Sequence, residues 1–451
     1  MFRLPKDTEM TNVIMMEFLD KHKKQVTDRY EKLYKAYISD HEILHQQAKE
    51  SYKPDNRIVV NFPKYIVDTM NGFFLGNPIK IVAEDEAVSD FVEYLDQYND
   101  QDDSNAELSK ICSIYGKGYE MYYTDENSEL CIAYLTPMEA FVIYDESIIE
   151  RPLYFVRRYT DRDNVERGSI SDGTSVRNFK ITGGFSWVDE WQPHYFKGVP
   201  VTEYVENEER QGLFEPVLSM VNAYNKALSE KANDVDYFAD AYLKVLGAKV
   251  DNEDIQFIRD TRVLNFEGED AQKIIVEFMD KPNNDASQEN LLNRLERLIF
   301  QISMVANISD ENFGASSGIA LKYKLQAMSN LEKTKERKFT SGMNRRYKLL
   351  FSHPSSNVPA DAWMQLKYHY TPNIPANLLE EAQIAAQMEG ITSHETQLKV
   401  LSIVDNVQAE LDRIEEENEA PKETVVDRLM FADAEEMNDE EVDAEGLEDE
   451  Q

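Results

Sequence analysis

Apolar residues recur at steps of three and four positions over long stretches of this chain, which is the spacing of amphipathic helices. The first stretch covers residues 8–50. A second covers 63–75, with a proline at its first position and the sequence Gly-Asn-Pro directly after it, a favourable start and a typical end. A third covers 319–351. The pattern predicts a protein that is mostly helical.

The most regular pattern lies in the middle of the chain. Within 216–245 the apolar side chains fall at steps of three or four almost throughout, which predicts one helix about 45 Å long. A second helix is expected within 286–308. Its apolar seam consists of Leu291, Leu295, Leu298, Ile302 and Val305. The residues between the two helices, 246–285, read as a small α/β insert with a short helix and strands at 262–266 and 273–279. This is either an ordinary helical hairpin with an insert, or a stalk that presents a docking module at its far end.

Between about 115 and 205 the pattern changes to short runs rich in Tyr, Val, Phe and Ile, separated by turn residues, as in β-strands. The stretch GSISDGTS at 168–175 is expected to be a hairpin tip or a mobile loop. Helices return at 373–417, with a glycine turn between two of them and Thr392 or Ser393 as an N-cap. The expected fold class is α+β, mostly helical.

The net charge of −37 argues against simple adhesion to nucleic acid or to an anionic membrane. The residues from Glu410 to Gln451 hold 19 acidic and three basic side chains, so they contribute −16 and leave −21 for the rest. From Pro421 onward the chain is acidic and poor in aromatic residues, and we expect it to be mostly disordered.

Two cysteines, Cys112 and Cys131, cannot form a disulfide framework or a cysteine-rich zinc site. The first ten residues lack the apolar core of a signal peptide, and no apolar run approaches the roughly 20 residues that span a bilayer. We therefore expect a soluble protein of a reducing compartment that makes no membrane contact.

One short motif suggests metal chemistry. His41, Glu42 and His45 match H-E-x-x-H, in which two zinc ligands and a general base share one helical face. A catalytic zinc needs a third protein ligand, yet the stretch 51–83 contains no Glu and no His. By composition, about one such chain in a hundred carries this motif by chance. The favoured interpretation is a helix capped by Asp40. In it the central Ile-Leu pair packs, and both histidines face water or a neighbouring subunit.

The polar stretch 309–318 contains GASSG, but its two glycines are one residue too close for a phosphate-binding loop, and Ile319 stands where that loop needs lysine. It is either a flexible connector or a mobile loop that touches a passing partner. The helix after it carries nine Lys or Arg against two Glu. Lys333, Lys335, Arg337 and Lys338 are distributed around that helix. This favours salt bridges in solvent and between subunits over a one-sided DNA-binding patch. Without a catalytic signature, we expect neither an enzyme nor a cofactor.

Four segments together carry a resemblance to one family: RIVVNFPKYIVDTMNGFFLGNPI, AYLTPMEAFVIYD, VPVTEYVENEERQGLFEPVLSMVNAYN and TPNIPANLLEEAQIAAQMEGITSHETQLKVLSIV. In this order they resemble the portal proteins of tailed bacteriophages, in the branch of siphophages with Gram-positive hosts. The most specific is VENEERQGLFEPV, which runs straight into a long helix. The resemblance spans roughly residues 30–415.

The resemblance implies a virion protein that assembles in the host cytoplasm as a ring of twelve subunits, sometimes thirteen when isolated, at one capsid vertex. Double-stranded DNA would pass through its channel during packaging and ejection. Implied partners are the terminase large subunit, a head-completion adaptor, and the major capsid and scaffolding proteins. A zinc-dependent hydrolase and a non-conducting capsid assembly factor are the alternatives.

The resemblance also implies how the chain is divided. The implied regions are a wing at 1–215, a first stem helix at 216–245, a clip at 246–285, a second stem helix at 286–308, a tunnel loop at 309–318, a return through the wing at 319–372 and a crown at 373–420. The remaining 421–451 resemble nothing specific and are expected to form an acidic disordered tail.

Three sets of site residues follow from this division. The tunnel loop would line the channel with Asn312, Phe313, Gly314, Ser316 and Ser317. The docking surface of the clip would include Arg259 and Arg262. The stem seams would pack through Val221, Tyr224, Leu228, Leu295, Leu298 and Ile302. Heptad seams suit packing between subunits in a ring that closes by rotation, and a net acidic ring would hold DNA weakly enough for it to slide.

Overall fold

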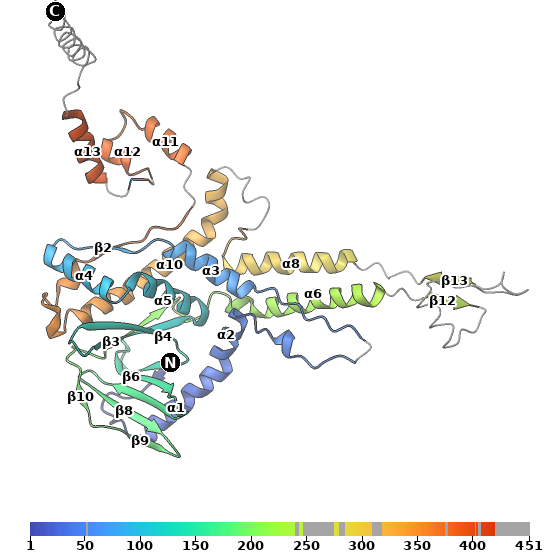
Figure 1. Cartoon of the computed structure of the whole chain (residues 1–451), viewed down its shortest axis with the longest axis horizontal. Helices are drawn as coiled ribbons and strands as arrows, with labels where there is room; N and C mark the ends of the chain where they lie inside the picture. Colours follow the sequence, from blue (N-terminus) through green and yellow to red (C-terminus); the bar gives the residue numbers. More distant parts are fainter. Residues whose placement is uncertain are drawn as a thin grey trace, which may run out of the picture. The chain divides into compact units, whose positions relative to one another are not determined.

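The structure is a computed structural model of the whole chain (Figure 1). It describes residues 1–50, 53–239, 243–246, 275–278, 285–308, 318–374, 378–401, 403–404 and 407–419. The chain divides into two units, Met1–Asn373 and Ile374–Gln451. Among the described residues, no helix has both the length and the apolar character needed to cross a membrane.

Helices dominate the first 115 residues, and those within 12–37 and 62–75 follow the predicted pattern. They are α1 (Asn12–Gln25), a π-helical turn (Val26–Tyr30), α2 (Glu31–Tyr37), a 3-10 turn (Glu42–His45), α3 (Phe62–Leu75), α4 (Glu86–Tyr98) and α5 (Gln101–Tyr115). The start of α3 confirms the sequence prediction, because Pro63 lies in its first turn and the Asn61 side chain accepts a hydrogen bond from the Lys64 N–H at 3.0 Å. The sequence pattern does not single out α4 and α5.

Strands fill residues 117–205, as predicted. One sheet has the order β1-β5-β6-β7-β8-β10, with β9 also paired to β8. Its members are β1 (Phe2–Arg3), β5 (Ala140–Tyr144), β6 (Pro152–Thr160), β7 (Glu166–Ser171), β8 (Ser175–Ile181), β9 (Phe185–Trp187) and β10 (Gln192–Pro193). A second sheet has the order β11 (Val201–Val205), β3 (Lys117–Thr124) and β4 (Leu130–Leu135). The predicted hairpin tip at 168–175 is confirmed, since β7 turns into β8 there.

Alternation along the strands of the larger sheet divides the core between its two faces. Phe141, Val156 and Ile170 point to one face, where α1 covers them with Met15 and Phe18. The opposite face packs on the three-stranded sheet. The β-region is therefore two stacked sheets with one helix on the outside.

Two helices project from this body side by side (Figure 1). A 3-10 turn (Glu215–Val217) leads into α6 (Leu218–Ala239), and α8 covers Asp285–Ser303. Beyond them, β12 (Leu243–Leu246) pairs antiparallel with β13 (Ile275–Phe278). The prediction of helix up to residue 245 is therefore wrong at its end, because the chain is already extended at Leu243. The strand at 273–279 is confirmed over 275–278, whereas the expected helix and the strand at 262–266 lie outside the described residues.

The long basic helix is confirmed as α10 (Gly318–Leu350). It is followed by 3-10 turns at Pro354–Ser356 and Ala362–Gln365 and by β14 (Lys367–His369), which pairs with β2 (Lys80–Val82). Met343, Tyr347 and Leu350 of α10 lie in the main core, together with residues of α3 and α5. This core holds the first unit together.

The second unit contains α11 (Leu378–Gln387), α12 (His394–Leu398) and α13 (Val407–Glu419). Ser393 caps α12, accepting the Thr396 N–H at 3.4 Å, which confirms one of the two predicted caps. The predicted acidic tail, 421–451, lies outside the described residues.

Candidate functional site

The base of the paired helices is an aromatic cluster. Phe62 of α3 packs edge-to-face on Tyr224 of α6, with ring centroids 5.0 Å apart, and on Phe300 of α8 at 5.7 Å. Tyr65, one turn further along α3, contacts Phe300 at 5.5 Å and accepts the Ile308 N–H at 2.8 Å. The N-terminal turns of α3 therefore hold both projecting helices at their base.

Each projecting helix buries a narrow apolar stripe. Val221 of α6 and Ile299 of α8 are fully buried in the main core, and Leu292 is buried further out. Tyr224 and Leu228, predicted seam residues, are half-buried. The stripe of α8 that faces the protein thus runs through positions 292 and 299.

This stripe corrects the predicted seam of α8. Leu295 and Leu298 are half-buried, while Leu291 is 50% exposed and Ile302 47% exposed. The physical reason is helical geometry. Positions 292 and 299 are seven residues apart and lie on one face, and this face is turned around the helix axis from the face that carries 291, 298 and 302. Leu291 and Ile302 of the predicted seam therefore lie open on the isolated subunit, whereas Val305 is buried as a seam residue should be. The role of the seam between subunits stays a prediction.

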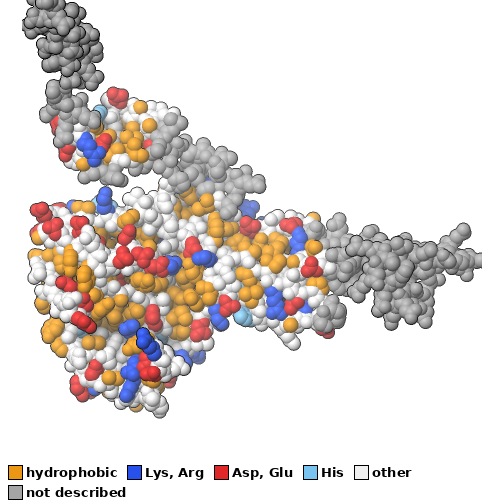
Figure 2. Space-filling view, viewed as in Figure 1, with side chains coloured by type: hydrophobic (Ala, Val, Ile, Leu, Met, Phe, Trp, Pro, Cys, Tyr) orange, Lys and Arg blue, Asp and Glu red, His pale blue; other side chains and the backbone are white. Residues whose placement is uncertain are grey.

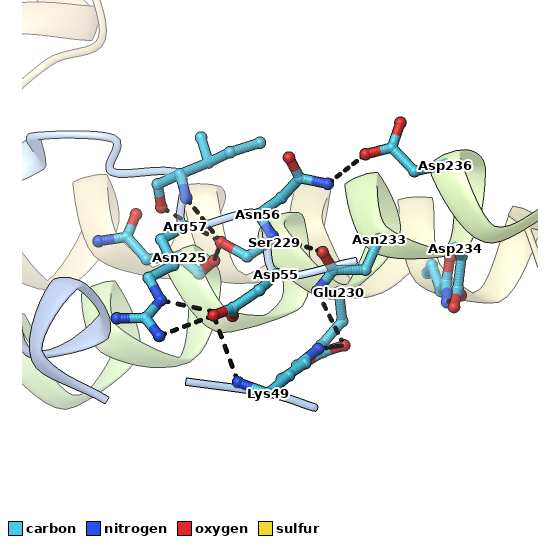
Figure 3. A network of polar contacts seen from close by, with 12 residues as sticks. Lys49, Asp55, Asn56, Arg57, Asn225, Ser229, Glu230, Asn233, Asp234 and Asp236 are labelled. Atoms are coloured by element: carbon cyan, nitrogen blue, oxygen red, sulfur yellow. Dashed lines mark hydrogen bonds and ion pairs between the residues drawn. The ribbon is translucent and has the colours of Figure 1, made fainter. Parts of the chain in front are cut away.

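An extended segment runs alongside α6 and is bonded to it by a ladder of polar contacts (Figure 3). We call residues 53–61 the strap. The N–H groups of Asn56, Ile58 and Val60 donate to side chains of α6: to Asn233 Oδ1 at 2.6 Å, to Ser229 Oγ at 2.9 Å and to Asn225 Oδ1 at 2.9 Å. We call Asn225, Ser229 and Asn233 the ladder residues.

The ladder works because two periods nearly coincide. Two residues of extended chain advance about 6.7 Å, and four residues of an α-helix advance about 6.0 Å. Alternate amides of the strap therefore meet every fourth side chain of α6. The three ladder residues are at most 5% exposed. A buried acceptor without a donor is costly, and here each one receives an N–H of the strap.

Further contacts hold the strap at its sides. The Asn56 side chain donates to Asp236 Oδ2 at 2.5 Å, and Lys49, four residues before the strap, pairs with Glu230 of α6 at 2.8 Å (Figure 3). Arg57 pairs with Asp55 at 2.7 Å and donates from Nη1 to the Leu44 carbonyl at 2.9 Å. The strap is thus bonded both to α6 and to the turn that precedes it.

That preceding turn contains the H-E-x-x-H match, and its geometry corrects the helix expectation. Glu42–His45 is a single 3-10 turn, and His41 before it is extended. The two histidines therefore do not share a helical face. Asp40 does not cap the turn, because its carboxylate pairs with His45. The described residues contain no group of three His, Cys, Asp or Glu side chains that could hold a metal ion.

The side chains of this turn divide differently from the sequence expectation. His41 is buried, and its Nδ1 accepts a hydrogen bond from Asn225 Nδ2 at 3.0 Å. Burial lowers the pKa of His41, which favours the neutral ring. Ile43 packs as expected, but Leu44 is exposed and His41 does not face water. Asn225 joins the strap, α6 and this turn, since its amide bonds both Val60 and His41.

The basic helix α10 corrects another expectation, because two of its cations are buried and paired within the subunit. Lys335 bonds Glu206 at 2.5 Å and Ser113 Oγ at 2.8 Å. Among the other cations, Lys333 pairs with Glu336 at 2.6 Å, and Lys338 pairs with Glu208. Salt bridges are therefore present, but these carboxylates belong to the same chain.

Arg346 makes the most enclosed ion pair. Its Nε and Nη2 donate to the two carboxylate oxygens of Glu120, at 2.8 and 2.6 Å, and Nη2 also donates to Asn105 Oδ1 at 2.6 Å. Glu120 accepts further hydrogen bonds from the hydroxyls of Tyr122 at 2.8 Å and Tyr204 at 3.1 Å. The α10 helix is thereby locked to β3 and β11.

Several predicted site residues lie outside the described residues. These are the tunnel-loop residues Asn312, Phe313, Gly314, Ser316 and Ser317 and the clip residues Arg259 and Arg262. Conversely, the sequence reasoning missed the ladder. Its signal was present, since polar residues at 225, 229 and 233 repeat every four positions on an otherwise amphipathic helix.

Comparison with known proteins identifies the class. A family model described as phage portal protein, SPP1 Gp6-like, matches residues 16–424. Because this match covers most of the chain, the chain belongs to the SPP1 Gp6-like family of phage portal proteins.

Individual relatives agree with the family. The portal protein of Bacillus phage SPP1 is 23% identical over 401 residues, covering 82% of this chain and 78% of that protein. The portal protein of Clostridium phage phiCD119 is 22% identical over 405 residues, covering 78% and 83%. A solved structure of the neck of an empty GTA particle, computed with C6 symmetry, aligns with a TM-score of 0.43 at 11% identity, covering 75% of this chain and 89% of that one.

Proposed function

We propose that this protein is the portal of a tailed phage: a ring at one capsid vertex through which double-stranded DNA is packaged and ejected. The observation that carries the proposal is the portal family match over residues 16–424. Both curated relatives are portal proteins of phages that infect Gram-positive hosts. The protein acts as a structural conduit of the virion, assembled in the host cytoplasm, and not as an enzyme.

The division of labour along the chain follows the described elements. The paired helices α6 and α8 are the stem, and β12 and β13 begin the clip that docks the terminase large subunit and later the head-completion adaptor. The body formed by residues 1–215 and 319–372 is the wing, which meets the major capsid and scaffolding proteins. The second unit is the crown, a boundary supported by the division of the chain after Asn373.

Subunits pack through Leu291, Leu298 and Ile302 of α8, which we call the open stripe. Leu291 and Ile302 are each about half exposed in the single chain, and they repeat at heptad-compatible spacing with Leu298. Patches of apolar surface left open on one subunit mark contact sites. A different surface of the next subunit would cover this stripe, and such heterologous contacts close into a ring of about twelve when each rotation is near 30°.

Weak electrostatic attraction suits a conduit. Every phosphate that a lysine or arginine neutralises releases counterions and tightens the grip on DNA. The chain carries −37, and four cations of α10 are paired within the subunit, so they are not free to bind phosphates. The duplex can therefore slide.

Native mass spectrometry and negative-stain microscopy of the purified protein test the proposal. We expect closed rings of about twelve subunits with a central channel. A protein that stays monomeric under assembly conditions would refute the portal and favour a non-conducting assembly factor. Stoichiometric zinc that is lost on His41→Ala would instead favour the hydrolase, although the 3-10 turn speaks against it.

A further inference from the structure

The direction of α6 is fixed at two separate places. Its start is anchored by Val217 of the preceding 3-10 turn and by Val221 in the core, and by Tyr224 against Phe62. The second attachment is the ladder, which begins one residue after Tyr224 and ends at Asn233. A rod is aimed by two fixed points, and here the second point is the strap.

The ladder is long and stiff enough to set an angle closely. From Asn225 to Asn233 there are eight residues, which is about 12 Å of helix. N–H···O hydrogen bonds tolerate a range of about 0.5 Å, from roughly 2.7 to 3.2 Å. A lateral movement of about 0.5 Å over a lever of about 12 Å turns the helix by about 2°.

The rotation between neighbouring subunits of a ring must be held to a similar tolerance of about 2° if the ring is to have one size. If the rotation from one subunit to the next is about 30° in a ring of twelve, it is about 28° in a ring of thirteen and about 33° in a ring of eleven. Neighbouring ring sizes thus differ by about 2 to 3° per contact. The open stripe of α8, which is packed on α6, changes its direction whenever α6 does.

We propose that the strap and its ladder residues, Asn225, Ser229 and Asn233, select the number of subunits in the ring by fixing the direction of α6. They are positioning residues: they act through α6 and touch neither DNA nor a partner protein. The inference rests on the proposed ring.

The contacts favour this role over simple stabilisation. An apolar stripe would hold a covering segment without fixing its register, whereas each buried acceptor of the ladder matches one particular amide. A slip of one residue would leave all three acceptors facing the wrong side of the strap. Asn225 also bonds His41, so the ladder is tied to the turn at 42–45.

Native mass spectrometry of assembled rings tests the inference. Ser229→Ala removes the middle acceptor with little change in volume, and Asn233→Ala removes the outer one. Ser229→Thr, which keeps a hydroxyl acceptor at the same place and adds no charge, is the matched control, and Lys226→Ala controls for change at an exposed position of α6. We expect the ratio of minor to major ring sizes to change about fivefold in the alanine variants, as for a lost hydrogen bond of about 1 kcal/mol. Both controls should match the wild type.

A covalent cross-link between the strap and α6 provides a second test, whose expected result a simple loss of stability would not produce. Asn56→Cys and Asp236→Cys are introduced into the Ser229→Ala variant, because the native side chains at these two positions touch, and the new thiols are joined by a short bis-maleimide. Both native cysteines are buried. Joining the new thiols before assembly should restore the wild-type ring size. Folded Ser229→Ala and Asn233→Ala variants that keep the wild-type distribution of ring sizes overturn the inference. A cross-linked variant that keeps the altered ratio of ring sizes of Ser229→Ala overturns it as well. Wild-type protein that forms no ring refutes the proposed function itself, and the inference with it.

Discussion

The buried pair between Arg346 and Glu120 offers the sharpest test of how the body is held together. The Arg346 side chain is fully buried and that of Glu120 is 2% exposed. Replacing Arg346 by Met removes two hydrogen bonds to the carboxylate and leaves Glu120 with the hydroxyls of Tyr122 and Tyr204. A buried charge that loses its partner costs about 3 to 5 kcal/mol of folding free energy. We therefore expect Arg346→Met to lower the free energy of unfolding by about 4 kcal/mol.

A double-mutant cycle separates the pair from its surroundings. Glu120→Leu alone strands the guanidinium and should cost about as much as Arg346→Met, whereas the double variant contains no unpaired charge. The double variant should lose no more than either single variant, so the sum of the two single losses should exceed the loss in the double variant by at least about 4 kcal/mol. Tryptophan fluorescence during urea unfolding, at one fixed protein concentration, reports on the right unit, because Trp187, Trp191 and Trp363 all lie within residues 1–373.

Two results would refute this reasoning. Loss of less than about 1 kcal/mol in Arg346→Met would mean that the pair is not desolvated, since exposed pairs contribute only about that much. Strictly additive single losses would mean that each side chain acts through packing alone. Lys338→Met is the matched control on the same helix: its partner Glu208 is exposed, so a loss of less than about 1 kcal/mol is expected.

Three further predictions concern the body and the ring. Burial raises the pKa of Asp96 to about 6, so the folded state binds a proton more tightly than the unfolded state and stability falls as the pH rises from about 4 to 6. Asp96→Asn should flatten this part of the curve of melting temperature against pH, and an unchanged slope would contradict the prediction. A Cβ on Gly342 would lie 2.3 Å from the Tyr204 ring, so Gly342→Ala should cost about 1 to 3 kcal/mol in urea unfolding, and a neutral result would show that the ring moves freely. Leu291→Glu with Ile302→Glu should abolish rings in native mass spectrometry without lowering the melting temperature; normal rings would exclude the open stripe of α8 as a subunit contact.

Local pattern was sufficient for much of the fold. The three-and-four spacing predicted α3, α6, α8 and α10 close to their observed bounds, because an amphipathic helix records its buried face in its own sequence. It failed at Leu243, where the spacing continued but the chain became a strand paired with Ile275–Phe278. That pairing partner is some 30 residues away, so no local pattern could report it.

The candidate site required contacts that span much larger separations. The sequence alone determined the helices with a clear three-and-four spacing, the β-region, the acidic charge and, through ordered segments, the portal family. The tertiary structure decided that His41 is a buried partner of Asn225, that Lys335 and Arg346 are paired inside the subunit, and that the strap lies on α6. Val60 and Asn225 are 165 residues apart, and Arg346 and Glu120 are 226 apart. A side chain's propensity is local, but its hydrogen-bond partner and its burial are fixed only when distant segments meet.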